Sequence, residues 1–108
     1  MNPQSVYEKL TKVGEEWADR EQAANLLEGT LKSIKAKIAM QHKDCGCGVA
    51  EAEMRAEDDY EYKEARKSAI EARTEAIKSK VRYQAAQAYI DAWRTVEASE
   101  RAANRMQV

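Results

Sequence analysis

Apolar side chains recur along the first forty residues at the spacing of one helix face. The positions are Val6, Leu10, Val13, Trp17, Ala24, Leu27, Leu31, Ile34 and Ile38. Steps of three and four residues predict an amphipathic helix with a narrow coiled-coil seam, interrupted where Arg20 stands in place of an apolar residue. Gly14 and Gly29 lie off this seam, and each costs the helix about 1 kcal/mol relative to Ala.

The second half of the chain carries a less apolar pattern. Its positions are Ala52, Ala56, Tyr60, Ile70, Thr74, Ile77 and Val81, and then, after a slip in phase, Ala85, Ala88, Ala92 and Val96. The slip predicts a local relaxation of the supercoil. Because neither Gly nor Pro occurs after Gly48, we expect one uninterrupted second helix over residues 49–105.

Between the two patterns stands the only cluster of turn-forming residues, Cys45-Gly46-Cys47-Gly48. It predicts a turn over residues 44–48 that follows a first helix over residues 3–43. At the start of that helix, Asn2 before Pro3 is typical of an N-cap, and Ser5 with Glu8 is an alternative capping box.

The order of charges along the chain favours an antiparallel hairpin. A basic run (Lys32, Lys35, Lys37, Lys43) precedes the turn, and an acidic run (Glu51, Glu53, Glu57, Asp58, Asp59, Glu61) follows it. Further out, an acidic stretch (Glu8, Glu15, Glu16, Asp19, Glu21, Glu28) meets a basic one (Arg66, Lys67, Arg73, Lys78, Lys80, Arg82). Such pairs favour one register over slipped ones.

The apolar positions suggest a register that agrees with the charges. It brings Leu31 and Ile34 near Tyr60 and Tyr62, Trp17 near Ile77, and Leu10 near Val81. For Arg20, a cross-seam partner such as Glu71 or Glu75 would make it a register-setting residue, and the alternative is that it points outward to solvent.

The predicted fold is therefore an all-α, antiparallel two-helix coiled-coil hairpin, a single domain over residues 1–108. The second helix is longer than the first and would overhang it beyond Tyr89. Because the overhang carries Ile90, Trp93 and Val96, we expect a homodimer in a four-helix arrangement, with Trp93 near the contact. The alternative is that Trp93 packs on Val6 and Tyr7 of its own chain.

Composition and charge exclude several classes of protein. Charged residues make up 34% of the 108 positions, yet the formal net charge is only −1, so there is no general attraction to nucleic acid. No apolar run reaches the ~20 residues that span a bilayer. The start, Met1-Asn2-Pro3-Gln4, lacks the basic and apolar regions of a secretory signal, and we expect a cytosolic protein.

The chemistry available for a site is sparse. His42, Cys45 and Cys47 are the one constellation with metal-ligating side chains, but their spacing is shorter than zinc sites use, and a turn with incidental reduced thiols is the simpler interpretation. Lys78, Lys80 and Arg82, with Tyr83 and Tyr89 nearby, are candidate contacts for single-stranded nucleic acid.

A catalytic site is not expected. The chain has a single His, no glycine-rich phosphate loop and no nucleophile elbow, and its carboxylates lie on solvated helix faces. We therefore expect a protein that is not an enzyme and needs no cofactor.

The sequence resembles small uncharacterised phage and prophage proteins that are encoded near recombination and DNA-metabolism genes. The residues that carry the resemblance are Trp17-Ala18, Leu26-Leu27-Glu28, Val49-Ala50-Glu51-Ala52-Glu53, Glu71-Ala72-Arg73 and Ala88-Tyr89-Ile90-Asp91-Ala92-Trp93-Arg94. The tip motif Cys45-Gly46-Cys47-Gly48 departs from that group. The resemblance implies a phage product that acts in the bacterial host cytoplasm beside DNA-handling machinery.

Three functions follow as expectations. The first is an accessory protein that binds a protein partner, as an adaptor or as an inhibitor of host defence, with Trp17, Tyr89, Ile90, Trp93 and Val96 as candidate contacts for self-association or for the partner. The second is an accessory factor for single-stranded nucleic acid. The third is a structural component of a virion or an assembly.

Overall fold

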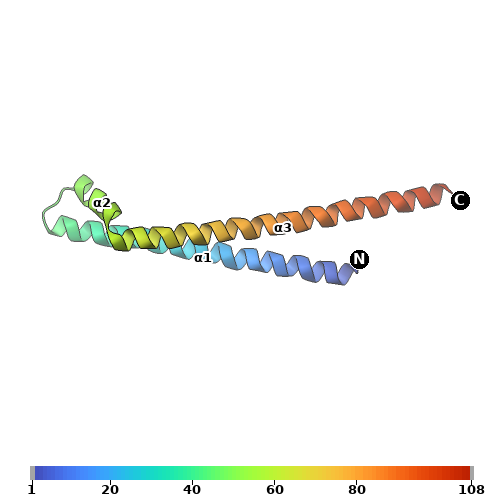
Figure 1. Ribbon diagram of the computed structural model, residues 1–108, viewed down its shortest axis with the longest axis horizontal. Helices are drawn as coiled ribbons and strands as arrows, with labels where there is room; N and C mark the ends of the chain where they lie inside the picture. Colours follow the sequence, from blue (N-terminus) through green and yellow to red (C-terminus); the bar gives the residue numbers. More distant parts are fainter. Residues whose placement is uncertain (1, 108) are drawn as a thin grey trace. The chain divides into compact units, whose positions relative to one another are not determined.

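The structure is a computed structural model that describes residues 2–107, and over those residues it consists of three α-helices without a strand (Figure 1). The helices are α1 (Pro3–Asp44), α2 (Val49–Asp58) and α3 (Tyr60–Met106). The all-α class is thus confirmed. Among the described residues, no helix combines the length and the apolar character that a membrane span requires.

The two ends of α1 are closed by hydrogen bonds. The side-chain Oδ1 of Asn2 accepts a bond from the Gln4 amide at 3.0 Å, and the Asn2 carbonyl accepts one from Val6 at 3.1 Å. Asn2 is therefore the N-cap, as predicted. At the other end, the Gly46 amide donates to Lys43 and the Cys47 amide to His42, with Gly46 at a φ of 100°. This is a Schellman cap, which favours Gly at its left-handed position.

The prediction of one uninterrupted second helix is wrong, because the helical backbone is broken at Asp59. Asp59 has extended backbone angles (φ −67°, ψ 139°) and separates α2 from α3. Its side-chain Oδ1 accepts a hydrogen bond from the Glu61 amide at 2.9 Å, so it caps the start of α3. Short acidic side chains compete with helical backbone bonds in this way and can divide a helix without Gly or Pro.

The chain divides into two compact units, which we describe separately. The tip unit is Ala18–Ile77 and contains the turn, α2 and the adjoining parts of α1 and α3. The end unit is Met1–Trp17 together with Lys78–Val108. Each unit pairs a segment of α1 with a segment of α3.

The tip unit has a small core where α2 covers the end of α1. Ile38 and Ala39 of α1 are buried together with Ala52 and Ala56 of α2, and the side chains of Ile34, Cys47 and Tyr62 pack against this cluster. Two ion pairs confirm the predicted meeting of the basic and acidic runs. Lys35 lies 2.8 Å from Glu57, and Lys37 lies 3.7 Å from Glu61.

The predicted seam of α1 is confirmed in large part, because its apolar positions are buried or half-buried with the exception of Leu27. The predicted seam of α3 is wrong by one residue. The positions of α3 that are protected from solvent include Tyr62, Ala65, Ala69, Ala72, Ala76, Ser79, Tyr83, Ala86, Ile90 and Trp93. They follow one unbroken alternation of three- and four-residue steps, so the predicted slip in phase is absent.

The shift has a physical reason in side-chain size. Most positions of the observed seam are Ala or Ser, whose small side chains allow two helix backbones to approach closely and leave space for the larger side chains of α1. As a consequence, large apolar side chains of α3 that were expected in the seam lie more than half exposed. They are Tyr60, Ile70, Ile77, Val81 and Val96.

Candidate binding surfaces

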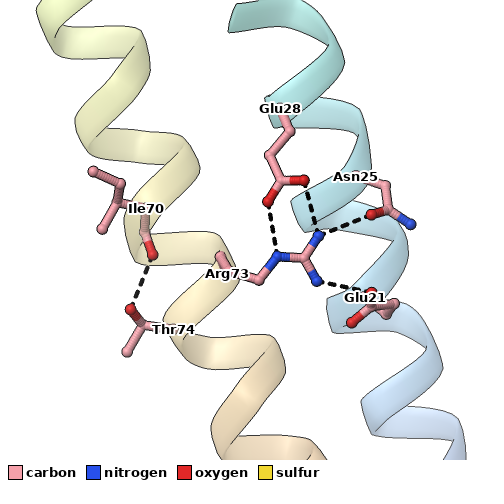
Figure 2. A network of polar contacts seen from close by, with 6 residues as sticks. All are labelled: Glu21, Asn25, Glu28, Ile70, Arg73 and Thr74. Atoms are coloured by element: carbon pink, nitrogen blue, oxygen red, sulfur yellow. Dashed lines mark hydrogen bonds and ion pairs between the residues drawn. The ribbon is translucent and has the colours of Figure 1, made fainter.

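The tip unit is held in register by Arg73 of α3, which reaches three side chains on one face of α1 (Figure 2). Its Nε and Nη2 donate to the two carboxylate oxygens of Glu28 at 2.7 and 3.0 Å. Its Nη1 donates to Glu21 at 2.7 Å, and Nη2 also donates to Asn25 at 2.8 Å. A planar guanidinium that fills several acceptors at once restricts both position and orientation.

The electrostatics of this contact are consistent with an ion pair at neutral pH. The hydrogen bond from Arg73 lowers the pKa of Glu28, and the bonds to Glu28 and Glu21 raise the pKa of Arg73. Nη1 of Arg20, the predicted register-setting residue, lies 4.0 Å from Oε2 of Glu75, which is one of its two predicted partners. Both of those side chains are nearly half exposed, so Arg73, which was expected only as one member of a basic stretch, is the stronger register-setting residue.

In the end unit, α1 and α3 are in contact through a pair of aromatic rings. The ring centroids of Trp17 and Tyr83 are 5.4 Å apart, with the planes tilted by 37°. Trp17 was expected beside Ile77; the ring that pairs with it is Tyr83, and Ile77 is 54% exposed. The ammonium of Lys80 lies 5.9 Å from the centroid of the Trp17 ring, within the range of a cation–π contact.

Gly14 is part of the same contact, although it was expected to lie off the seam. A Cβ at position 14 would lie 3.3 Å from Cε2 of Tyr83, closer than ordinary contact. The absence of a side chain thus makes room for the Tyr83 ring. By contrast, a Cβ at Gly29 would meet nothing within 4 Å. The signal in the sequence is the spacing of Gly14, three residues before Trp17 and therefore on a neighbouring part of the same helix face.

Two buried polar atoms in the end unit lack a hydrogen-bond partner among the described residues, namely Nε1 of Trp17 and Oγ of Ser79. An unsatisfied polar atom in a dry contact costs free energy. Ser79 is 1% exposed, so its hydroxyl has little access to water. The end unit is therefore held by shape and aromatic contact more than by polar bonds across the seam.

A groove of about 360 Å³ lies between the two helices of the end unit. It is lined by Val6, Lys9 and Leu10 of α1 and by Ala86, Tyr89 and Ile90 of α3. Ile90 is buried at its floor, whereas 63% of the Tyr89 surface is exposed. Leu10 was expected near Val81, but it lies instead at this groove, and Val81 is exposed.

Beyond the groove, α3 continues to Met106. Trp93 is half-buried, and Val96 is 55% exposed. Residues 98–107 are all exposed. Four of the five candidate contact residues, Tyr89, Ile90, Trp93 and Val96, are thus close together in the sequence of α3, and two of them line the groove.

The candidate residues for contact with nucleic acid, Lys78, Lys80 and Arg82, interact with other groups of this protein. Lys80 lies over Trp17, and Arg82 lies 3.4 Å from Glu16. Lys78 also takes part in an interaction. These contacts place the basic side chains among acidic and aromatic neighbours of the same protein.

At the turn, Cys45 is exposed and Cys47 is half-buried against the tip core. Both are free thiols. Within the described part of the chain, no group of three or more His, Cys, Asp or Glu side chains could hold a metal ion. His42 contributes its backbone carbonyl to the cap, where it accepts the Cys47 amide at 3.1 Å.

No protein-family model, no curated protein and no solved structure matches this chain.

Proposed function

We propose that this chain is a non-enzymatic binding protein whose end unit accepts an apolar segment of a protein partner. The observation that carries the proposal is the placement of the large apolar side chains of α3. The seam uses small residues, and therefore Tyr89 remains exposed at a groove that the buried Ile90 also lines, and Val96 is exposed further along α3. Apolar side chains gathered at a concave surface are typical of a contact site for another protein.

The composition of the groove favours a protein segment over a small polar ligand. Its lining is apolar except for Lys9 and the hydroxyl of Tyr89. Tyr and Trp contribute large contact area at low entropic cost and are enriched among residues that dominate binding energy. We therefore expect an amphipathic helix of the partner to place its apolar face over Leu10 and Tyr89.

The resemblance to phage proteins favours a partner from phage or host DNA machinery, bound in the bacterial cytoplasm. In that setting the chain would act as an adaptor or as an inhibitor. A homodimer through Trp93 and Val96, in a four-helix arrangement, is the other occupant that this surface would suit.

The proposal is tested by affinity purification of the tagged chain from infected or lysogenic bacterial cells. The test variant is Tyr89→Ser with Val96→Ser, and the matched control is Leu26→Ser, which removes a side chain of α1 that is 65% exposed in the tip unit. We expect one protein to co-purify in stoichiometric amount with the wild type and the control, and to be lost with the test variant.

Retention of the same protein by the test variant would contradict this site. Co-purification of nucleic acid alone, released by salt, would favour the nucleic-acid function instead.

A further inference from the structure

Lys9 is the only charged side chain that lines the groove of the end unit. The other lining side chains bring no acidic group to it, and they are Val6, Leu10, Ala86, Tyr89 and Ile90. Glu8, the next residue along α1, lines a different hollow. Lys9 is exposed, and no ion pair joins it to another of the described residues.

Other cations of the end unit have partners within the chain. Arg82 lies 3.4 Å from Glu16, and the ammonium of Lys80 lies over the ring of Trp17. Lys9 differs from both, because its neighbours in the groove are apolar or carry only a hydroxyl. Its charge is therefore available to a group that another molecule brings.

A Lys side chain at the edge of an apolar groove has two parts with opposite preferences. The four-carbon stem is stable against apolar surface, whereas the ammonium is stable in water. A segment that covers Leu10 and Tyr89 would remove water from the ammonium of Lys9. That removal costs free energy unless an anion takes the place of the water, and a carboxylate on the segment would supply it.

The formal charge of the end unit favours the same kind of partner. Its two segments, Met1–Trp17 and Lys78–Val108, carry eight Lys and Arg residues against six Asp and Glu residues, a net charge of +2. The whole chain, by contrast, has a net charge of −1. A positive unit attracts an acidic segment before contact and repels a basic one.

We propose that the groove selects a partner helix that carries an Asp or Glu side chain beside its apolar anchor, and that Lys9 determines this specificity. The inference rests on the function proposed above, because it requires an apolar segment in the groove. It adds the chemistry of that segment. An acidic amphipathic helix is bound, and a basic helix with the same apolar face is rejected.

The test is fluorescence anisotropy of three labelled synthetic helices mixed with the full chain. The helices share leucines along one face and differ only in the residues that flank this face, which are Glu, Gln or Lys. We expect the wild type to bind the Glu helix about three- to tenfold more tightly than the Gln helix, as for a partly covered charge pair. The Lys helix should bind most weakly, and added salt should reduce the differences.

Three variants isolate the role of Lys9. Lys9→Gln should reduce the preference for the Glu helix to at most about twofold, and Lys9→Glu should reverse it in favour of the Lys helix. A reversal would not follow from a loss of folding. The matched control is Lys12→Gln, which removes an exposed Lys of α1 that lines the hollow beside Glu8 and should keep the preference. Because Lys9→Gln and Lys12→Gln remove the same charge from the end unit, only a local role of Lys9 separates them.

The outcomes distinguish this inference from the function on which it rests. Equal binding of the three helices by the wild type would overturn the selection, and so would the same loss of preference in Lys9→Gln and Lys12→Gln. If equal binding is abolished by Tyr89→Ser with Val96→Ser, the groove remains the contact site and only the selection is contradicted. If none of the three helices binds the wild type, the apolar contact and the selection are both contradicted.

Discussion

The ring of Tyr83 in α3 lies against the backbone of Gly14 in α1, where a Cβ would approach Cε2 of Tyr83 to 3.3 Å. A larger residue at position 14 would therefore have two opposing effects on stability. Alanine would favour the helix, but the Tyr83 ring would have to move by a few tenths of an ångström and would disturb its contact with Trp17.

The effects of Gly29→Ala and Gly14→Ala on the free energy of unfolding should therefore differ in sign or in size. We expect Gly29→Ala to raise the free energy of unfolding by about 0.5–1 kcal/mol, because it improves helix propensity at an open position. Gly14→Ala should give no gain or a loss, and the gain should return in the Tyr83→Ala background. Urea unfolding measures these variants, the Tyr83→Ala parent and the wild type, and equal gains at both glycines would contradict the close contact.

Removal of Arg73 should change how stability depends on pH. The bond from Arg73 lowers the pKa of Glu28, so its contribution is present above the ordinary carboxyl pKa and is lost as the pH falls through the lowered one. Arg73→Gln should lower the melting temperature by several degrees at neutral pH and by less in acid.

The matched control for that prediction is Arg55→Gln, which breaks an exposed pair within α2, to Glu51 at 2.8 Å. It should have a smaller effect at neutral pH, because exposed pairs within one helix contribute little. Thermal unfolding followed by circular dichroism at several pH values measures both variants. An Arg73→Gln protein whose stability curve parallels the wild type would show that the Arg73 contact does not form.

Ser79→Ala should stabilise the protein. The substitution removes a buried hydroxyl that has no hydrogen-bond partner among the described residues, and Ala also has the higher helix propensity. We expect a gain of about 1 kcal/mol in the free energy of unfolding, measured by urea titration. Ser68→Ala, at an exposed position of the same helix, measures the effect of helix propensity alone. An equal gain in the free energy of unfolding from Ser68→Ala would show that burial of the Ser79 hydroxyl does not contribute.

Asp59→Ala should destabilise the start of α3. It removes the side-chain acceptor of the Glu61 amide, and loss of an N-cap costs about 0.5–2 kcal/mol. Asp58→Ala is the neighbouring control, because that side chain is 88% exposed and accepts only the longer contact from Lys63. Amide hydrogen exchange over residues 60–64 should rise in the first variant alone.

Much of the architecture could be predicted from the sequence. The steps between Val6 and Ile38 gave α1 and its seam, Asn2 and Gly46 marked its two ends, and the charge blocks indicated which segments meet. Pairs such as Lys35 with Glu57 and Arg82 with Glu16 confirm those blocks. These features are either local or spread over long runs of charge, so an error of one residue in the register does not hide them.

The details that set the surfaces could not be predicted in the same way. In α3, large apolar residues such as Ile77 stand next to small ones such as Ala76, and a pattern weighted by hydrophobicity selects the larger. Which of the two neighbours enters the seam depends on the space that α1 leaves, a property of both helices together. The break at Asp59 contains neither Gly nor Pro, the strongest signals of an interruption, and depends instead on a short acidic side chain that caps the next helix.

The most direct test of this seam is nuclear Overhauser contacts between side chains in isotope-labelled protein. The indole protons of Trp17 should show contacts to the ring protons of Tyr83, and the methyl groups of Ile77 should show none to Trp17. With that result, the large apolar side chains of α3 are free to bind other proteins. Contacts from Trp17 to the Ile77 methyls, without contacts to Tyr83, would put Ile77 inside the helix pair and contradict the seam on which the proposed binding surface of the end unit depends.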